Sequence, residues 1–366
     1  MTRIVFAGGG TGGHLYPGIA IARALVAARP TVEPFFVGAR RGIERDVLPK
    51  TEFPHVLLDL HPLYRSAVWN NYKTMIGAIG AWRHIGDMIR QNRPAVVVGT
   101  GGYAAGIMMA YGVLHGIPLV QQVGDSHPGL TARAFSRWSY EIYLNFPEAA
   151  RALRSHHQGS LVDTGAPIEP PPEPRPDKRA ARERWGFPPT GGHVLLVYGG
   201  SQGSLAINRA VASWIDRGLP DDVYVIWGTG RGTHAQFARY DGGRVCVRDY
   251  LSPVSEAYAA ADLAVARAGA MTTAELFAWC IPAVLIPLPT AAADHQTTNA
   301  LTLERAGAAV HIPQSQLTAE RLDSTLRNLL GNDAELRRLS EGAAKRARPH
   351  AAAEIAQHIL HVVDRA

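Results

Sequence analysis

Short runs of apolar and β-branched residues alternate along the chain with longer segments of helical periodicity. We expect strands at residues 4–7, 34–38, 94–99, 117–121, 193–198, 223–227, 245–247, 263–266 and 283–287. Several of these runs are apolar at every position, which is typical of parallel strands covered by helices on both faces. Helical patterns lie between them, for example at residues 19–28, 205–215 and 351–363. The alternation predicts an α/β fold with doubly wound parallel sheets.

A proline-rich segment divides this pattern into two halves. Prolines crowd between residues 167 and 176, a charged helix candidate follows at 178–185, and the strand–loop–helix pattern then restarts at residue 193. Such a composition is typical of an interdomain linker. We expect an N-terminal domain, a linker, a second domain and a helix that returns to the first domain, at residues 1–165, 166–190, 191–345 and 346–366. Two sheets of this kind predict a ligand cleft at the carboxyl ends of their strands.

The composition is that of a folded protein. The chain has 366 residues, of which 46% are hydrophobic and 19% charged, so we expect no extensive disorder. Two cysteines cannot form a disulfide framework or a four-ligand zinc site, which favours a reducing cytoplasm. We expect neither a secretory signal nor a membrane-spanning helix. The net charge of +6 fits an acidic partner, such as phosphate groups, nucleic acid or an anionic membrane surface.

A glycine loop follows the first predicted strand. Gly8, Gly10 and Gly13 satisfy the pattern G-x-G-x-x-G, in which backbone N–H groups and a helix N-terminus can approach an anion. A site for NAD also needs an acid at the end of the second strand, where this chain has Arg40 and Arg41. A site for NADP and a tight turn without a ligand therefore remain alternatives.

His14 and Ser201 are candidate functional side chains beside two glycine loops. His14 directly follows the first loop, and an imidazole there can act as a general base near neutral pH. Ser201 lies in the second loop, at residues 199–203, and adds a hydroxyl to its backbone donors.

A third element opens the helix that follows the predicted strand at residues 263–266. Gly269 permits a tight turn, and Thr272 and Thr273 lie in the first helical turn, where hydroxyl and N–H groups can bind a diphosphate. Glu275 can reach ribose hydroxyls, although a capped surface helix would show the same pattern. The chain has no Asp-x-Asp sequence and no cluster with metal-ligand spacing, so we expect helix N-termini to stabilise a leaving diphosphate.

Taken together, these motifs resemble the MurG family of N-acetylglucosaminyltransferases. The resemblance extends in order along essentially the whole chain. Its five motifs are residues 8–14 with Pro17, residues 99–103, 199–203, 267–275 and 294–299.

The resemblance implies a GT-B glycosyltransferase fold, with two Rossmann-like domains that face a central cleft. It implies inverting, metal-independent transfer of N-acetylglucosamine from UDP-N-acetylglucosamine to lipid I, which gives lipid II in peptidoglycan synthesis. No cofactor is expected. The implied partners are the nucleotide sugar, a polyprenyl-pyrophosphoryl lipid and an anionic membrane surface, without nucleic acid. The implied location is the cytoplasmic face of the cell membrane, as a peripheral protein.

The resemblance also implies roles for single residues. His14 corresponds to the candidate base. The implied donor-binding residues are Thr11, Gly12, Gly13, Ser201, Leu251, Ala270, Met271, Thr272, Thr273, Glu275 and Gln296. On the acceptor side the resemblance implies Tyr103, Asp125 and Glu169.

Two of these positions depart from the family pattern. Residues 123–127 read Val-Gly-Asp-Ser-His, and residues 165–169 read Gly-Ala-Pro-Ile-Glu, so that the family's asparagine becomes Asp125 and its arginine becomes Glu169. These changes favour an alternative, a related GT-B enzyme with a different lipid or natural-product acceptor. Asp125 could itself be the base, or it could orient His14.

Residues 61–93 combine basic and apolar side chains. The segment has a single acid, Asp87, and five basic side chains, Arg65, Lys73, Arg83, Arg90 and Arg93. Met75, Ile76, Ile79 and Trp82 have the spacing of one helical face. This pattern predicts contact with an anionic bilayer surface. A helix that only packs on the sheet remains the alternative.

Overall fold

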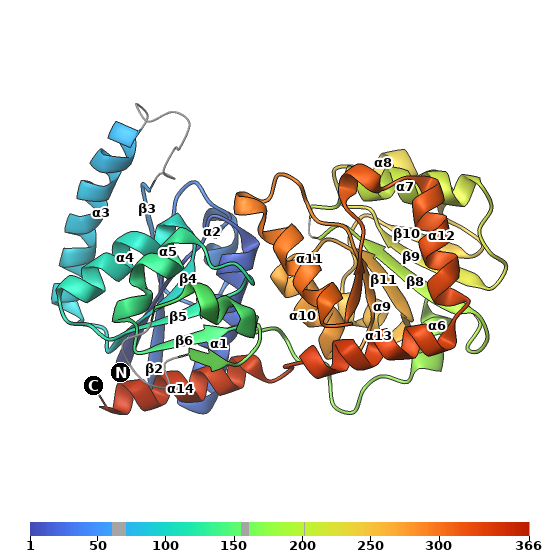
Figure 1. Cartoon of the computed structure of the whole chain (residues 1–366). Coiled ribbons are helices and arrows are strands. Elements are labelled where there is room, and N and C mark those ends of the chain that lie inside the picture. Colours follow the sequence, from blue (N-terminus) through green and yellow to red (C-terminus); the bar gives the residue numbers. More distant parts are fainter. Residues whose placement is uncertain (61–70, 155–160, 201, 366) are drawn as a thin grey trace. The chain divides into compact units, whose positions relative to one another are not determined.

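The computed structural model describes residues 1–60, 71–154, 161–200 and 202–365. The chain forms two compact units. The first consists of Met1–Glu169 together with Pro349–Ala366, and the second of Pro170–Arg348. Figure 1 labels the helices and strands of both units.

The first unit is built on a parallel sheet. Its described residues form seven strands in the order β3-β2-β1-β4-β5-β6-β7. These strands are β1 (Thr2–Gly8), β2 (Val32–Ala39), β3 (His55–Leu58), β4 (Val96–Gly101), β5 (Leu119–Val123), β6 (Glu141–Leu144) and β7 (Leu161–Asp163). β1 pairs with both β2 and β4, with Phe6 opposite Phe36 and Val98. The loops that follow β1, β4 and β5 therefore meet at one edge of the sheet.

Helices cover both faces of this sheet. They are α1 (Gly12–Ala28), α2 (Glu44–Val47), α3 (Asn71–Gln91), α4 (Tyr103–Leu114), α5 (Leu130–Phe135) and α14 (Ala351–Arg365), with 3-10 turns at Leu48–Lys50, Ser136–Trp138 and Pro147–Ala152. α1 and α14 pack with Ile4 and Phe6 of β1, whereas α3 and α4 pack with Val5 of the same strand. Because successive strand residues point to opposite faces, these two cores lie on opposite sides of the sheet.

The C-terminal helix α14 belongs to the first unit, although it follows the second in the sequence. It lies along α1 (Figure 1), and its Ile355 and Ile359 are fully buried in the same core. Arg29, which follows α1, forms a bidentate pair with Asp364 at 2.7 Å. The side chain of His358 on α14 lies 2.9 Å from a carboxylate oxygen of Glu141 on β6.

The second unit repeats the architecture. Its described residues form six parallel strands in the order β10-β9-β8-β11-β12-β13. These are β8 (His193–Tyr198), β9 (Val223–Gly228), β10 (Val245–Arg248), β11 (Leu263–Ala266), β12 (Ala283–Leu285) and β13 (Ala309–His311). The helices are α6 (Lys178–Arg184), α7 (Leu205–Asp216), α8 (His234–Phe237), α9 (Val254–Ala260), α10 (Ala270–Ala278), α11 (His295–Arg305), α12 (Ala319–Leu330) and α13 (Asp333–Arg346), with 3-10 turns at Ala238–Tyr240, Ala292–Asp294 and Gln314–Gln316. Trp214 and Trp227 are fully buried in its core.

The predicted fold class is confirmed, and most predicted strands differ from the observed ones by one or two residues. The largest boundary difference is in α1, which begins at Gly12 and not near residue 19. Three glycines and Pro17 give this first part a low helix propensity. The burial of Leu15 and Ile19 against the sheet outweighs that propensity.

The predicted apolar face of α3 lies partly outside the described residues. Residues 61–70 and the side chains of Met75 and Ile76 lie outside the described residues. Ile79 is 57% exposed, whereas Trp82 packs on Tyr111 of α4 with ring centroids 4.8 Å apart. Ile79 and Trp82 therefore do not share one environment, because the sheet-facing side of α3 runs through Ala81 and Ile85.

We expect Ile359→Ala to loosen α14 from the first unit. The substitution removes a fully buried side chain from the core shared with α1 and should cost about 3 kcal/mol. Hydrogen exchange of the β1 amides measures this loss, with Gln357→Ala, exposed on the same helix, as the control. Unchanged exchange in the Ile359 variant would show that α14 does not stabilise this sheet.

Candidate functional site

The first glycine loop joins β1 to α1. Gly10 has a φ of +86°, a conformation that favours glycine, and a Cβ atom there would lie 3.0 Å from the ring of Tyr103. Thr11 is the N-cap of α1 but makes no side-chain capping hydrogen bond. Gly12 and Gly13 form the first helical turn. This places three predicted donor-binding residues, Thr11, Gly12 and Gly13, at the N-terminus of a helix.

His14 lies against both this loop and the one after β4. Its Nδ1 atom is 3.3 Å from the carbonyl oxygen of Gly9 and 3.2 Å from Oγ1 of Thr11. A Cβ atom at Gly101 would lie 2.7 Å from the imidazole ring, so glycine is needed there. Because a carbonyl oxygen only accepts hydrogen bonds, the contact with Gly9 favours a proton on Nδ1. In neutral histidine, Nε2 is then the atom that can accept a proton.

Glu44 is a buried acid at this loop that the sequence reasoning missed. Its side chain is fully buried, and Oε1 accepts a hydrogen bond from the backbone N–H of Ala39 at 3.2 Å. A Cβ atom at Gly9 or at Gly42 would clash with its carboxyl group. Its Oε2 atom has no hydrogen-bond partner within the described part of the chain. The only sequence signal was an acid shortly after the second strand, beyond the positions considered.

Glu44 changes the interpretation of the glycine pattern. In a dinucleotide site, the acid after the second strand reaches the ribose, but Glu44 is fully enclosed. Gly9 is required by Glu44, and Gly10 by Tyr103, so these glycines make room for side chains of the protein. Arg40 donates from Nε to the carbonyl of Leu57, so it too takes part in the local structure. None of these contacts favours NADP.

The predicted acceptor-side residues lie on different elements of the first unit. Tyr103 opens α4 and packs against Gly10. Asp125 is half-buried and follows β5. In the sheet order β5 lies two strands from β1, so these two strands are about 10 Å apart. Glu169 is exposed at the end of the first unit. The hydrogen bond from Arg23 to Glu52 is the main cause that raises the pKa of Arg23, and the charge of Glu169 raises it further.

In the second unit, Ser201 lies outside the described residues. The loop around it packs closely, because a Cβ atom at Gly203 would clash with the carbonyl of Thr229. Ser204 ends the loop and caps α7, where its hydroxyl accepts from the N–H of Ile207 at 3.4 Å.

Arg267 connects this loop to two others. One guanidinium nitrogen donates to the carbonyl oxygens of Ile286 and Pro287, at 3.0 and 2.9 Å. Another donates to Ser204 Oγ and to Gln314 Oε1, both at 2.7 Å. Arg267 is 8% exposed, and burial lowers its pKa from the usual value. The sequence placed Arg267 at the start of a motif without indicating these contacts.

The N-terminus of α10 follows β11 in the same region. Gly269 is its N-cap and supplies no side-chain hydrogen bond, and Ala270, Met271 and Thr272 form the first turn. The Thr273 hydroxyl is buried and donates to the carbonyls of Gly269 and Ala270. Its backbone N–H also donates to the carbonyl of Gly269, at 3.0 Å, so both donors of Thr273 are used within the helix.

Glu275, Gln296 and Leu251 complete the predicted donor-binding residues. Glu275 accepts a hydrogen bond from the Tyr258 hydroxyl at 2.8 Å. Gln296 accepts from the N–H of Leu288 at 3.0 Å, which fixes the orientation of its amide. Leu251 is buried and follows β10, packed close to Gly228 at the end of β9. No motif in the sequence indicates the contact with Tyr258.

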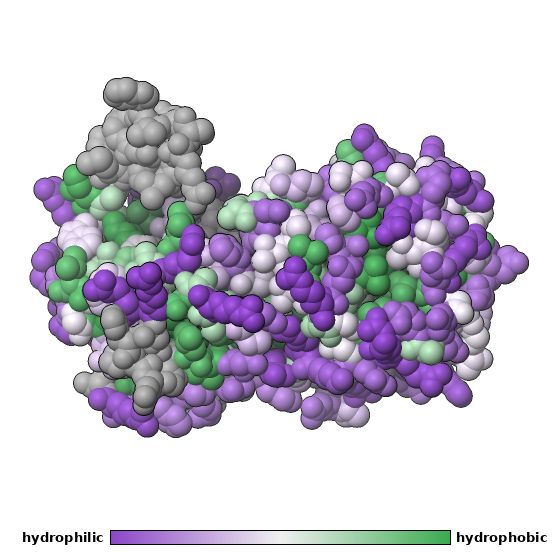
Figure 2. All heavy atoms as spheres, in the orientation of Figure 1, coloured by the Kyte–Doolittle hydropathy of each residue, from purple (hydrophilic) through white to green (hydrophobic). Residues whose placement is uncertain are grey.

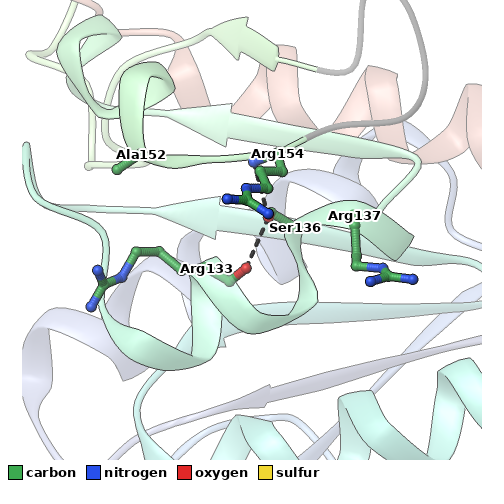
Figure 3. Close-up of a pocket in the computed structure, with 5 residues that line it drawn as sticks. All are labelled: Arg133, Ser136, Arg137, Ala152 and Arg154. Carbon is green, nitrogen blue, oxygen red and sulfur yellow. Dashed lines mark hydrogen bonds between the residues drawn. The ribbon is translucent and has the colours of Figure 1, made fainter.

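Three arginines surround a pocket of about 340 Å³ in the first unit. Figure 3 shows Arg133 and Arg137 extending to either side of Ser136, with Arg154 beside it. Ser136 donates to the carbonyl of Arg133 and accepts from the N–H of Arg154. Arg137 also lies over the ring of Trp138, which is 43% exposed. The i, i+4 spacing of Arg133 and Arg137 was a signal that the sequence reasoning did not use.

The described residues include neither a metal-binding cluster nor a membrane-spanning helix. They contain no group of three or more His, Cys, Asp or Glu side chains that could hold a metal ion. None of the described helices has the length and apolar character needed to cross a membrane.

Both parts of the chain match domains of one glycosyltransferase family. Residues 4–144 match the N-terminal domain of glycosyltransferase family 28, and residues 194–358 match its C-terminal domain. Among solved structures, MurG from Acinetobacter baumannii has a TM-score of 0.76 and 24% identity, with all of both chains covered. The glycosyltransferase of kitacinnamycin has a TM-score of 0.71 and 18% identity, over 99% of this chain and 98% of that one. These likenesses show the GT-B fold.

Two curated relatives are similar over almost their whole length. A UDP-N-acetylglucosamine--N-acetylmuramyl-(pentapeptide) pyrophosphoryl-undecaprenol N-acetylglucosamine transferase from Salinibacter ruber is 40% identical, over 99% of this chain and 97% of its own. The enzyme of the same name from Porphyromonas gingivalis strain W83 is 36% identical, over 99% and 96%. The chain therefore belongs to the MurG family of glycosyltransferases.

Proposed function

We propose that this protein transfers N-acetylglucosamine from UDP-N-acetylglucosamine to lipid I, the undecaprenyl-pyrophosphoryl N-acetylmuramyl-pentapeptide, with inversion at the anomeric carbon. The observation that carries the proposal is the 40% identity to the Salinibacter ruber enzyme over 99% of the chain, because the name of that enzyme states this transfer of N-acetylglucosamine. The product is lipid II, the precursor of peptidoglycan.

In this proposal, His14 is the general base. The acceptor hydroxyl oxygen attacks the anomeric carbon, the bond from that carbon to UDP breaks with its electron pair, and the hydroxyl proton moves to Nε2 of His14. The contact of Nδ1 with the Gly9 carbonyl supports this role, since it favours the tautomer that can accept a proton at Nε2. Asp125 is the rival base, or it orients His14.

The second unit would bind the donor. The N–H groups of Ala270, Met271 and Thr272 at the start of α10 would bind the diphosphate, and the helix dipole would stabilise the charge of the leaving UDP. Arg267 adds a buried positive charge that also orders the loop ending at Ser204. In this arrangement the transfer needs no metal ion.

The remaining donor contacts follow the resemblance. The ribose would bind to Glu275, the sugar hydroxyls to Gln296, and the uracil to the backbone at Leu251. In the second loop, Ser201 would bind the diphosphate. In the first unit, Thr11, Gly12 and Gly13 would lie on the sugar and acceptor side.

A second candidate keeps the donor and changes the acceptor to another lipid or a natural product. Glu169 and Asp125 favour it, because both depart from the family pattern on the acceptor side. A carboxylate at Glu169 would repel an anionic ligand that an arginine would attract.

We also propose that the first unit binds the cytoplasmic face of the cell membrane as a peripheral protein. Figure 2 shows hydrophobic atoms at the surface over α3 and α4, among hydrophilic ones. Ile79 on α3 and Trp138 beside the arginine pocket are exposed. Arg133, Arg137 and Arg154 would attract anionic headgroups, each contributing about 1 kcal/mol near such a surface.

Incubation of the purified protein with lipid I and labelled UDP-N-acetylglucosamine tests the reaction directly. We expect labelled lipid II, at a rate that a metal chelator leaves unchanged. Binding of UDP without any lipid II would favour the second candidate. Loss of turnover on chelation would contradict the metal-free arrangement.

The two proposed roles predict different kinetic defects. We expect His14→Ala to lower kcat by about 10²-fold or more and to leave the affinity for UDP unchanged. Glu275→Ala should chiefly raise the KM for the donor, by about tenfold. His361→Ala, an exposed histidine on α14, is the control. If Asp125→Asn abolished turnover and His14→Ala did not, Asp125 would be the base.

Charge reversal in the arginine pocket tests membrane binding. We expect Arg137→Glu to weaken co-sedimentation with vesicles that contain an anionic phospholipid by roughly tenfold, with little binding to neutral vesicles in either case. Arg337→Glu makes the same charge change on the exposed side of α13 and should have no effect. Equal binding of both variants to the anionic vesicles would show that the arginine pocket takes no part in the membrane contact.

A further inference from the structure

Two buried tyrosines lie behind Glu275 in the second unit. Tyr258, on α9, donates its hydroxyl hydrogen to Oε2 of Glu275 at 2.8 Å. The hydroxyl of Tyr198, the last residue of β8, lies 3.1 Å from that of Tyr258. Tyr258 is 4% exposed and Tyr198 8% exposed, whereas Glu275 on α10 is half-buried. The series leads from the core to a carboxylate that solvent can reach.

The chemistry of these groups fixes the direction of the hydrogen bonds. An ionised carboxylate only accepts, and a tyrosine hydroxyl carries one hydrogen. Because the hydrogen of Tyr258 points to Glu275, the hydrogen of Tyr198 must point to the Tyr258 oxygen. By donating its own hydrogen to the Tyr258 oxygen, Tyr198 favours the arrangement in which Tyr258 donates to the carboxylate.

The tyrosines remain donors throughout the working pH range. Burial raises the pKa of Tyr258 well above its usual value, and the neighbouring Tyr198 and Glu275 raise it further. Burial also raises the pKa of Tyr198. The ring of Tyr258 also contacts two aromatic rings, that of Trp279, which follows α10, with centroids 6.0 Å apart, and that of Tyr198 with centroids 6.3 Å apart.

We propose that Tyr258, supported by Tyr198, is a positioning residue that holds the Glu275 carboxylate toward the ribose hydroxyls of the nucleotide. This rests on the proposed function, in which Glu275 binds the ribose. A carboxylate has about four acceptor positions, and Tyr258 occupies one of them on Oε2. Holding the group in one rotamer lets its other positions meet the ribose without a further loss of side-chain freedom.

The position of Tyr198 adds a connection to the phosphate-binding region. Tyr198 directly precedes the glycine loop at residues 199–203, and Glu275 lies on the helix whose first turn would bind the diphosphate. The tyrosine pair therefore couples the end of β8 to α10, and should make the second unit select ribonucleotides over deoxyribonucleotides.

Calorimetric titration with UDP, 2′-deoxy-UDP and 3′-deoxy-UDP tests this selection. The unsubstituted protein should prefer UDP to at least one analogue by about tenfold. In Tyr258→Phe we expect UDP binding to weaken about fivefold and analogue binding by less than about twofold, so that the preference shrinks. A role in folding alone would weaken all three ligands equally.

Two further variants complete the test. Tyr240→Phe removes another tyrosine hydroxyl of the second unit, bonded to Asp216 at 2.8 Å, and should leave the preference intact. Tyr198→Phe should reduce the preference less than Tyr258→Phe, and the double variant should match Tyr258→Phe alone, because Tyr198 acts through Tyr258. Urea unfolding of each variant reports any general loss of stability.

The outcomes separate this inference from the proposed function. If Glu275→Ala removes the preference while Tyr258→Phe keeps it, Glu275 binds the ribose and the positioning role is wrong. If Tyr258→Phe weakens UDP and both analogues to the same extent, the positioning role is also wrong. If Glu275→Ala binds all three ligands as the unsubstituted protein does, the ribose role of Glu275 fails, and the inference fails with it.

Discussion

The candidate chemistry of both units depends on the unpaired N–H groups of helices that begin at the carboxyl edge of a parallel sheet. At some other helices a side chain satisfies one of these groups, as Asn332 does at α13 and Thr318 does at α12. At α1 and α10, the N-cap residues Thr11 and Gly269 make no side-chain capping bond. Helices α4, α9 and α11 also lack a side-chain cap. Both α1 and α10 follow strands that lie inside their sheets, β1 and β11. An anion at these two termini would supply what a capping side chain supplies at α12 and α13.

Glycines at this edge have a second role, which explains why a glycine pattern alone is ambiguous. Gly101 leaves room for the imidazole of His14, and Gly9 for the carboxyl group of Glu44. A small residue in such a loop can therefore bring two parts of the protein together without any ligand near it. The same pattern in a dinucleotide-binding protein makes room for a pyrophosphate. Whether the glycines make room for a protein side chain or for a ligand depends on residues distant in sequence. The glycine pattern alone therefore does not identify a binding site.

The sequence predicted nine of the thirteen described strands, because each of these records its environment locally, and it missed β3, β6, β7 and β13. β11 coincides with the predicted residues 263–266, since a strand covered on both faces is apolar throughout. The apolar face of α3 was less predictable, because its spacing did not show that Trp82 packs on Tyr111 while Ile79 stays exposed. The bond from Tyr258 to Glu275 depends on how α9 and α10 meet in space. The family resemblance assigned roles to single residues such as Glu275, but it did not identify the side chains that contact and support them.

Arg267 shows what the second unit would gain from an anionic ligand. Its guanidinium is buried among neutral acceptors and has no carboxylate partner in the described part of the chain. Burial lowers its pKa, which means that the charged form is less stable there than in water. A structure that keeps a charge under this strain usually pairs it, because an uncompensated buried ion costs several kcal/mol. Its bond to Ser204 places the charge at the end of the second glycine loop, where a bound diphosphate would offset part of that cost. Ordering of the loops and attraction of the ligand would then come from the same side chain.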